Sequence, residues 1–104
     1  MDRRIKASRT QEKKLAKDIG GTTVAGSGAG WAVKNDVRNK TWSVECKTTG
    51  ASRFPLTHRD LVKAEQNALL DLRRMAFAVE MQGRTWVTVS LETFLGLIER
   101  EEDT

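Results

Sequence analysis

The chain has 104 residues, which suits one domain with a modest core, and its 18 Lys and Arg against 14 Asp and Glu give a net charge of +4. Residues 1–63 carry 14 basic against 6 acidic residues (+8) and residues 64–104 carry 4 against 8 (−4). This basic half suggests a polyanionic partner, most simply nucleic acid, with solvated helix faces as the alternative. One cysteine and one histidine exclude an intrachain disulfide and a Cys/His metal cluster. No segment resembles a membrane span or a signal peptide, so we expect a soluble cytoplasmic protein.

The first element is a predicted helix over residues 10–19, with Thr10 as its N-cap, a narrow apolar stripe and a Gly-Gly pair after it. Residues 1–9 are predicted to form a flexible basic arm or an extension of this helix. Glu12 lies close to the apolar stripe. It either pairs with a neighbouring lysine or contributes a carboxylate to a site.

A short strand over residues 22–24 precedes a loop over residues 25–30 that contains three glycines. The loop opens no helix and lacks a Lys-Ser or Lys-Thr ending, so it is not a Walker-type phosphate loop. Its glycines allow the backbone to approach a ligand closely, or allow a sharp bend between strands. The two interpretations have equal weight.

Residues 31–37 and 41–47 are predicted to form a hairpin. The second strand alternates polar and apolar side chains with the period of a half-buried strand. Glu45 and Lys47 therefore share one face, roughly 7 Å apart. The first strand brings Asp36 beside Glu45 in one register only, and the sequence leaves that register open.

The second half of the chain is predicted to contain a long helix, two strands and a last helix. Thr57 and Asp60 form a capping box for the long helix, and Ser90 caps the last one. The apolar stripe of the last helix is expected to face the core. These elements span residues 57–74, 75–81, 85–89 and 91–100, and the inward side chains of the last helix are Phe94, Leu95 and Ile98.

Two carboxylates and a lysine on one surface suit metal-assisted hydrolysis of a phosphodiester. Oxygen ligands such as Asp36 and Glu45 suit Mg²⁺ or Mn²⁺, and Lys47 would orient a water or neutralise charge on a phosphate. The alternative is a solvated sheet face, since Glu-x-Lys occurs by chance in many strands. Cys46, on the opposite and apolar face, is expected to be a buried core thiol.

The arrangement Asp36 … Glu45-Cys46-Lys47 resembles the motif of the PD-(D/E)xK nucleases, with Asn35 where a proline often stands. The order of predicted elements is also similar to that superfamily. The resemblance implies an α/β protein with a restriction-endonuclease-like αβββαβ core, in which helices flank a central mixed sheet. Residues 10–104 would form this single domain.

Within the superfamily, the chain is most similar to the archaeal-type Holliday junction resolvases and their phage relatives. The shared features are the glutamate of the first helix and three segments, Gly26-Ser27-Gly28, Glu45-Cys46-Lys47-Thr48-Thr49 and Pro55-Leu56-Thr57, the last leading into a helix that carries Gln66. The resemblance implies that Asp36, Glu45 and the Cys46 carbonyl bind Mg²⁺, or Mn²⁺ in its place. Lys47 would act on the attacking water, Glu12 would complete the acidic site, and Ser27 would lie near the scissile phosphate.

The resemblance further implies a homodimeric, Mg²⁺-dependent DNA endonuclease that acts on four-way junctions in DNA recombination and repair, in keeping with a short, phage-encoded protein. Two alternatives remain. One is another PD-(D/E)xK nuclease, restriction-like, repair or nicking, on duplex, flap or single-stranded DNA. The other is a non-catalytic DNA-binding protein of the same fold. The residues expected to contact DNA are Arg3, Arg4, Arg9, Lys13, Ser27, Lys34, Arg53, Arg59 and Lys63.

Overall fold

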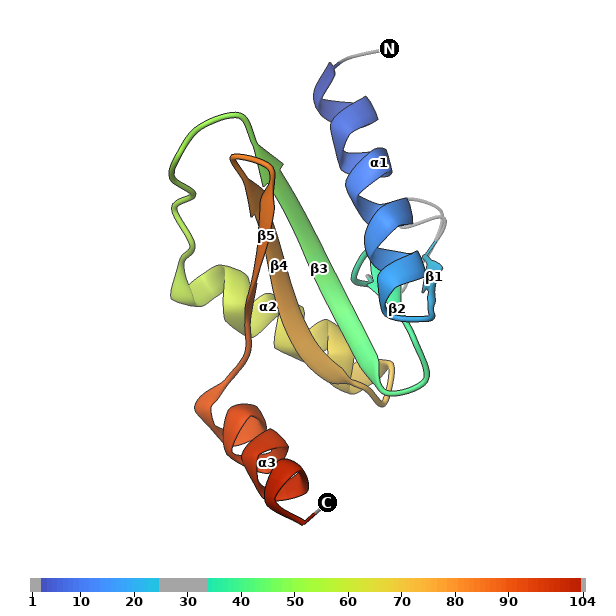
Figure 1. Ribbon diagram of the computed structural model, residues 1–104, viewed down its shortest axis with the longest axis vertical. Coiled ribbons are helices and arrows are strands. Elements are labelled where there is room, and N and C mark those ends of the chain that lie inside the picture. The colour runs from blue at the N-terminus through green and yellow to red at the C-terminus, as the bar shows by residue number, and fades with distance from the viewer. Residues whose placement is uncertain (1–2, 25–33, 104) are drawn as a thin grey trace.

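The computed structural model describes residues 3–24 and 34–103, within which five strands form one mixed sheet and three helices are present (Figure 1). The predicted α/β class and the predicted order of elements are confirmed. None of the described helices has the length and apolar character needed to cross a membrane. The helices are α1 (Arg3–Asp18), α2 (His58–Leu70) and α3 (Leu91–Glu102), and the strands are β1 (Thr22–Thr23), β2 (Val37–Arg38), β3 (Trp42–Thr49), β4 (Arg74–Met81) and β5 (Arg84–Thr88).

The sheet has the strand order β1-β2-β3-β4-β5. β1, β2 and β3 run antiparallel to one another, β3 and β4 are parallel, and β5 returns antiparallel to β4. A parallel pair needs a crossover connection, and α2 supplies it between β3 and β4. The β4–β5 hairpin turns over Gln82 and Gly83, which both have positive φ (51° and 74°), as a two-residue turn of type I′ requires.

The helices α1 and α2 cover opposite faces of the sheet and create two apolar clusters. On one face Ala16 of α1 packs with Val44 and Cys46, which confirms the buried thiol. On the other face Ala64 of α2 packs with a cluster that includes Phe77. β4 is buried on both faces because it lies between these clusters, which explains its nearly continuous apolar sequence.

The first helix is longer than predicted. α1 begins at Arg3, so the residues of the expected arm from position 3 onward are helical, and the helix-extension interpretation holds there in place of the flexible arm. Thr10 is not an N-cap. It lies inside the helix, where its hydroxyl donates to the Lys6 carbonyl oxygen at 2.9 Å. The added turns contain Arg, Lys and Ala, which are strong helix formers, and this explains the extension.

The long helix α2 has the predicted capping box at Thr57 and Asp60 but ends at Leu70, four residues earlier than expected. The chain leaves the helix through Leu72, which has a positive φ of 56°. The carboxylate of Asp71 receives two hydrogen bonds from Arg38 at 3.0 and 3.1 Å and lies 3.2 Å from Arg73, so the helix end is tied to β2 and to the start of β4.

The expected strand over residues 31–37 is also shorter. β2 contains Val37 and Arg38. Residues 34–36 come before the strand begins, and residues 31–33 lie outside the described part of the chain. The turn that follows is organised by Asn39, whose side-chain oxygen accepts from the amides of Thr41 and Trp42 at 2.9 and 2.7 Å. The hairpin is therefore tight.

The prediction that α3 packs its apolar stripe inward is wrong. Phe94 and Leu95 are each 52% exposed, Ile98 is half-buried, and none of the twelve described residues of α3 is buried. Ser90 does cap the helix, accepting from the Thr93 amide at 3.1 Å. Figure 1 gives the reason: α3 lies beyond the end of the sheet, at the opposite end of the molecule from the start of α1.

Candidate functional site

The structure brings Asp36 and Glu45 together at the edge of β3. The register pairs Val37 with Val44, and one further step sets Asp36 opposite Glu45. The Asp36 amide donates to the Val44 carbonyl at 3.0 Å, and its carboxylate accepts from the Cys46 amide at 2.9 Å. The register that the sequence left open therefore has the arrangement in which the two carboxyl groups are neighbours.

Asp36 is held in place by the residue before it. Asn35 is only 2% exposed, and its amide nitrogen donates to the Ser43 hydroxyl at 2.9 Å and to the Ala64 carbonyl at 3.0 Å. Its amide oxygen accepts from the Asn67 side chain at 3.2 Å. This buried network anchors the chain before Asp36 to β3 and α2. Asn35 thus has a positioning role that the sequence analysis did not recognise.

One of these polar partners, Asn67, could have been predicted from the sequence. Asn67 occupies the inward stripe of α2 beside Ala68, where an unpaired amide would be costly, so a buried partner was to be expected. Ser43 shares the face of Glu45 and Lys47, for which a solvated sheet face was the alternative interpretation. It is buried because α2 covers that face.

The pairing of the two carboxyl groups changes the acidity of Glu45. Burial, a hydrogen bond to the Asp36 carboxyl and the negative charge of Asp36 raise the pKa of Glu45 to about 8, against the lowering effect of Lys47 and Lys63. At neutral pH the pair therefore holds a proton, with protonated Glu45 as the donor to Asp36. Any cation that binds both groups must displace this proton.

Cys46 contributes its backbone rather than its side chain. Burial, together with the charges of Asp36, Glu12 and Glu45, raises the pKa of the Cys46 thiol, so the sulfur stays protonated and is a poor nucleophile. In a strand, the amide and the carbonyl of one residue point to the same side. Because the Cys46 amide meets Asp36, its carbonyl oxygen faces the same edge as the two carboxyl groups.

The oxygen atoms available to bind a metal are therefore those of the Asp36 and Glu45 carboxylates and of the Cys46 carbonyl. The described residues contain no group of three or more His, Cys, Asp or Glu side chains placed to hold a metal ion. Mg²⁺ commonly binds through one or two carboxylates and retains several waters, so a pair of carboxylates suits it better than it suits Zn²⁺. The site suits a hard cation because Asp36 and Glu45 offer carboxylate oxygens, which such cations prefer as ligands.

Two lysines act on the carboxyl pair. Lys47 is exposed and follows Glu45 on the same face of β3, and Lys63 extends from α2, which covers that face. Both positive charges lower the pKa of Glu45, which shows that both ammonium groups lie close enough to interact with it. The site is thus acidic at its centre and basic at its rim.

The first helix brings two residues to the same edge. Burial and the charge of Asp36 raise the pKa of Glu12, and Arg9 lowers it, so Glu12 lies within electrostatic reach of Asp36. Gln11, which the sequence analysis missed, is 4% exposed and donates from Nε2 to the Lys47 carbonyl at 2.8 Å. Its Oε1 is buried and has no partner among the described residues. The sequence did contain a signal for this role, because Gln11 is a polar residue beside the apolar stripe of α1.

The residues expected to contact DNA fall into two groups. Those with described side chains are exposed, and they are Arg9, Lys13, Lys34, Arg53, Arg59 and Lys63. Ser27 with its glycine loop, and the side chains of Arg3 and Arg4, lie outside the described part of the chain. Arg53 belongs to the loop after β3, which is anchored by the contact of Phe54 with Phe77, at 6.4 Å between ring centroids.

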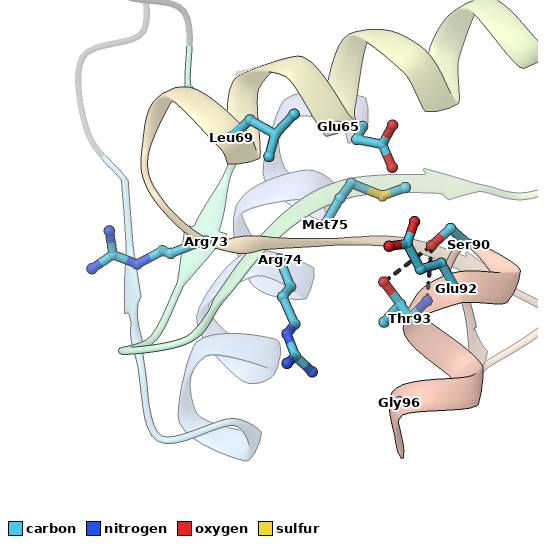
Figure 2. A pocket seen from close by; sticks show the side chains of 9 residues that line it. All are labelled: Glu65, Leu69, Arg73, Arg74, Met75, Ser90, Glu92, Thr93 and Gly96. Carbon is cyan, nitrogen blue, oxygen red and sulfur yellow. Dashed lines mark hydrogen bonds between the residues drawn. The ribbon is translucent and has the colours of Figure 1, made fainter. Parts of the chain in front are cut away.

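One of the described cavities lies away from this site. It has a volume of about 440 Å³ and is enclosed by α2, the start of β4 and the first turn of α3 (Figure 2). The pairing of the parallel strands β3 and β4 shows how far apart the cavity and the site are. Arg74, which lines the cavity, pairs with Trp42, whereas Lys47 of the site pairs with Val79. Five residues of strand, or roughly 16 Å, separate the two positions. The cavity is therefore a separate feature.

Comparison of the chain with protein-family models, with curated proteins and with solved structures finds no match. The interpretation of the site accordingly rests on its own geometry. That geometry consists of two adjacent carboxyl groups at a strand edge, a backbone carbonyl on the same side and two lysines nearby.

Proposed function

We propose that the protein is a Mg²⁺-dependent DNA endonuclease of the PD-(D/E)xK type with a restriction-endonuclease-like core. The observation that carries the proposal is the adjacency of Asp36 and Glu45 at the edge of β3, with Lys47 next on the same face. Carboxylates that share a proton in the absence of a cation are suited to bind one, and a lysine beside them is suited to act on water or phosphate. The order of helices and strands supports the assignment.

In this proposal Asp36, Glu45 and the Cys46 carbonyl hold a Mg²⁺ ion, which lowers the pKa of bound water and polarises the phosphate. Lys47 orients the attacking water and stabilises negative charge that develops on the phosphate oxygens. Glu12 adds negative charge close to Asp36. Asn35 and Gln11 hold the backbone on either side of the carboxyl pair and do not touch the substrate.

The proposed substrate is branched DNA, with the four-way junction first. The exposed basic side chains around the site, including Arg53, Arg59 and Lys63, suit contacts with phosphates rather than bases. Selectivity for a junction over duplex or single strands is inferred from the resemblance of the sequence motifs to junction resolvases. The experiment therefore tests the choice of DNA substrate separately from the metal-dependent cutting.

The test incubates the purified protein with end-labelled four-way junction, duplex and single-stranded DNA, each with Mg²⁺ and with chelator. Glu45→Gln and Asp36→Asn keep the size of the side chains and remove the ligand charge. Glu65→Gln is the matched control, because Glu65 is exposed on α2 and lines the separate cavity. We expect metal-dependent paired nicks in the junction, unchanged in the control and reduced at least about 100-fold in both site variants.

Three other results are informative. Cutting of duplex or single strands with the same metal and carboxylate dependence would keep the nuclease assignment and change the substrate. DNA binding without metal-dependent cutting of any substrate would overturn the enzymatic assignment and favour a non-catalytic DNA-binding protein. Cutting that persists in Glu45→Gln would show that this carboxyl pair is not the active site.

A further inference from the structure

The fold leaves Trp86 of β5 exposed beside a positive charge. Trp86 is 51% exposed, and the Arg84 guanidinium lies over its ring, 4.4 Å from the ring centroid. Within residues 3–24 and 34–103, no carboxylate forms an ion pair with Arg84. The cation–π contact favours one orientation of the ring, and the guanidinium keeps its N–H donors available for another partner. β5 therefore presents an oriented aromatic ring next to an unpaired cation.

The pairing of the strands shows which face of the sheet carries this ring. Trp86 pairs with Val79 of β4, and Val79 pairs with Lys47 of β3. Paired residues of neighbouring strands project to the same face, and Val79 belongs to the apolar cluster beneath α2. Trp86 therefore shares a face of the sheet with Glu45 and Lys47 of the candidate site. Two strand spacings, or roughly 10 Å, separate the backbones of Lys47 and Trp86.

Side-chain hydrogen bonds hold the strands together at this end of the sheet. The Nε2 atom of Gln82, in the β4–β5 turn, donates to the Gly50 carbonyl at 3.3 Å, directly after β3. The Thr48 hydroxyl donates to the Glu80 carboxylate at 3.1 Å. Figure 1 shows the β4–β5 turn and the end of β3 at the same end of the sheet, where the loop toward α2 begins. The spacing between the candidate site and the exposed ring is therefore set by the sheet itself.

Charge on this face favours a nucleic acid as the ligand. Arg53 directly precedes Phe54, whose ring packs against Phe77 of the cluster beneath α2, so the loop after β3 brings Arg53 to this face. Glu80 is adjacent to Val79 in β4 and therefore projects to the opposite face. The exposed cations near the candidate site and the ring are Lys47, Arg53 and Arg84. Phosphates match these cations and a base matches the ring, whereas a purely apolar partner would have to bury the cations.

We propose that Trp86 is the stacking position for an unpaired base of the DNA that the candidate site binds. In a duplex each base is paired and stacked inside the helix, so placing it on a protein side chain costs the free energy of unpairing it. An unpaired base avoids this cost. Aromatic side chains stack on any base, because every base has a π-face. Arg84 meets a phosphate beside the stacked base.

The stacking position defines the class of DNA that binds best. It is branched DNA with unpaired nucleotides at the branch, such as a flap or a four-way junction whose centre is not fully paired. A fully paired junction keeps the phosphate contacts and lacks the base for Trp86. That this DNA is cut rests on the proposed nuclease function, whereas the stacking of the base does not.

The test measures binding of the full chain to DNA by fluorescence anisotropy in the presence of chelator, so that no DNA is cut. Two junctions of the same arms are compared, one fully paired and one with unpaired thymidines at the branch point. We expect the wild type to bind the second junction at least about fivefold more tightly, which is the lower end for one base stacked on an aromatic ring. Trp86→Ala should bind both junctions equally. Trp86→Phe keeps an aromatic ring and should restore most of the preference.

Val87→Ala is the matched control. Val87 is the next residue of β5 and is 56% exposed, but it projects to the opposite face of the sheet. This variant should keep the full preference for unpaired nucleotides. A wild type that binds both junctions equally would overturn the proposal, and so would a preference that Trp86→Ala leaves unchanged.

A second measurement decides the question if Trp86→Ala does not fold. Titration of the wild type with oligothymidylate in chelator should quench part of the tryptophan fluorescence, because a base stacks on the indole ring. Trp86→Phe should bind the same DNA without that part of the quenching. Equal quenching in both proteins would overturn the proposal, since the bases would then contact another tryptophan.

Cutting is measured separately with Mg²⁺, so that the two proposals fail independently. A protein that cuts no DNA but shows the Trp86-dependent preference would support the stacking position and overturn the nuclease function alone. A protein whose cutting depends on Asp36 and Glu45, without any Trp86-dependent preference, would overturn the stacking position alone.

Discussion

The carboxyl pair of Asp36 and Glu45 should make the stability of the protein depend on pH. The folded protein raises the pKa of Glu45 to about 8, from its ordinary value of 4.5. Between these values the folded state holds a proton that the unfolded state has lost, so the free energy of unfolding falls as pH rises. The slope is at most about 1.4 kcal/mol per pH unit. Urea unfolding without metal, at several values between pH 5 and pH 8, measures it.

The same experiment on Glu45→Gln provides the control. The amide does not titrate, so most of the slope should disappear, while a small part remains because the pKa of Glu12 is raised as well. Mg²⁺ should have the opposite effect on the wild type, since it competes with the proton and stabilises the folded state more at higher pH. A wild-type slope equal to that of the variant would mean that the two carboxyl groups do not share a proton.

A second prediction at the residue scale concerns Asn35. The change Asn35→Ala leaves the buried polar groups of Ser43 and Asn67 without their partner, and we expect it to lower the free energy of unfolding by about 2 kcal/mol. It should also reduce metal binding, since Asp36 follows directly in the chain. Gln66→Ala, at an exposed position of α2, should change stability by less than about 0.5 kcal/mol. Chemical denaturation of the three proteins compares them, and equal stabilities would contradict the prediction.

The sequence identifies Asp36, Glu45 and Lys47 as candidate site residues, but it does not show how they are arranged. Period-2 alternation was enough to place Glu45 and Lys47 on one face of a strand, and this is the face that α2 covers. The contact of Asp36 with Glu45 depends on the register of a short hairpin, which the sequence leaves open. The supporting residues Asn35 and Gln11 were missed because their partners are distant in sequence, and two of those partners are backbone carbonyls.

At the scale of elements, the C-terminus of α2 is held by charge. Asp71 accepts from Arg38 of β2 and lies beside Arg73, with its side chain only partly exposed. We expect Asp71→Ala to lower the free energy of unfolding by about 1 to 2 kcal/mol, because two half-buried guanidinium groups lose their carboxylate. Asp18→Ala, at the exposed end of α1, is the control and should have little effect. Thermal unfolding at low and high salt measures both, and the penalty should shrink with salt.

Periodicity identified the type and order of the elements but not all their limits or contacts. The early end of α2 reflects a left-handed backbone at Leu72, a conformation that a leucine rarely adopts and that no sequence pattern indicated. The inward packing of α3 failed for a different reason. A helical stripe shows which side of a helix is apolar, but it does not show whether the element's own chain or another molecule covers that side.

For the whole molecule, the separation of charge determines how it would meet DNA. The body is basic and α3 is acidic, so phosphate contacts should come from the body alone. Each lysine or arginine that meets a phosphate adds about 0.9 to the slope of log affinity against log salt concentration. Arg53 is exposed on the loop that follows β3, close in the chain to Lys47, and belongs to this group.

We therefore expect Arg53→Gln to weaken DNA binding and to reduce the salt slope by about 1, whereas Arg100→Gln on α3 should leave both unchanged. Fluorescence anisotropy with labelled DNA and chelator, at salt concentrations from about 50 to about 200 mM, measures the slope in the absence of cutting. The two substitutions change the net charge of the chain equally, so a general charge effect would alter both slopes alike. Equal effects would show that the protein attracts DNA by its overall charge, and an effect of Arg53→Gln alone would place the phosphates beside the carboxyl pair.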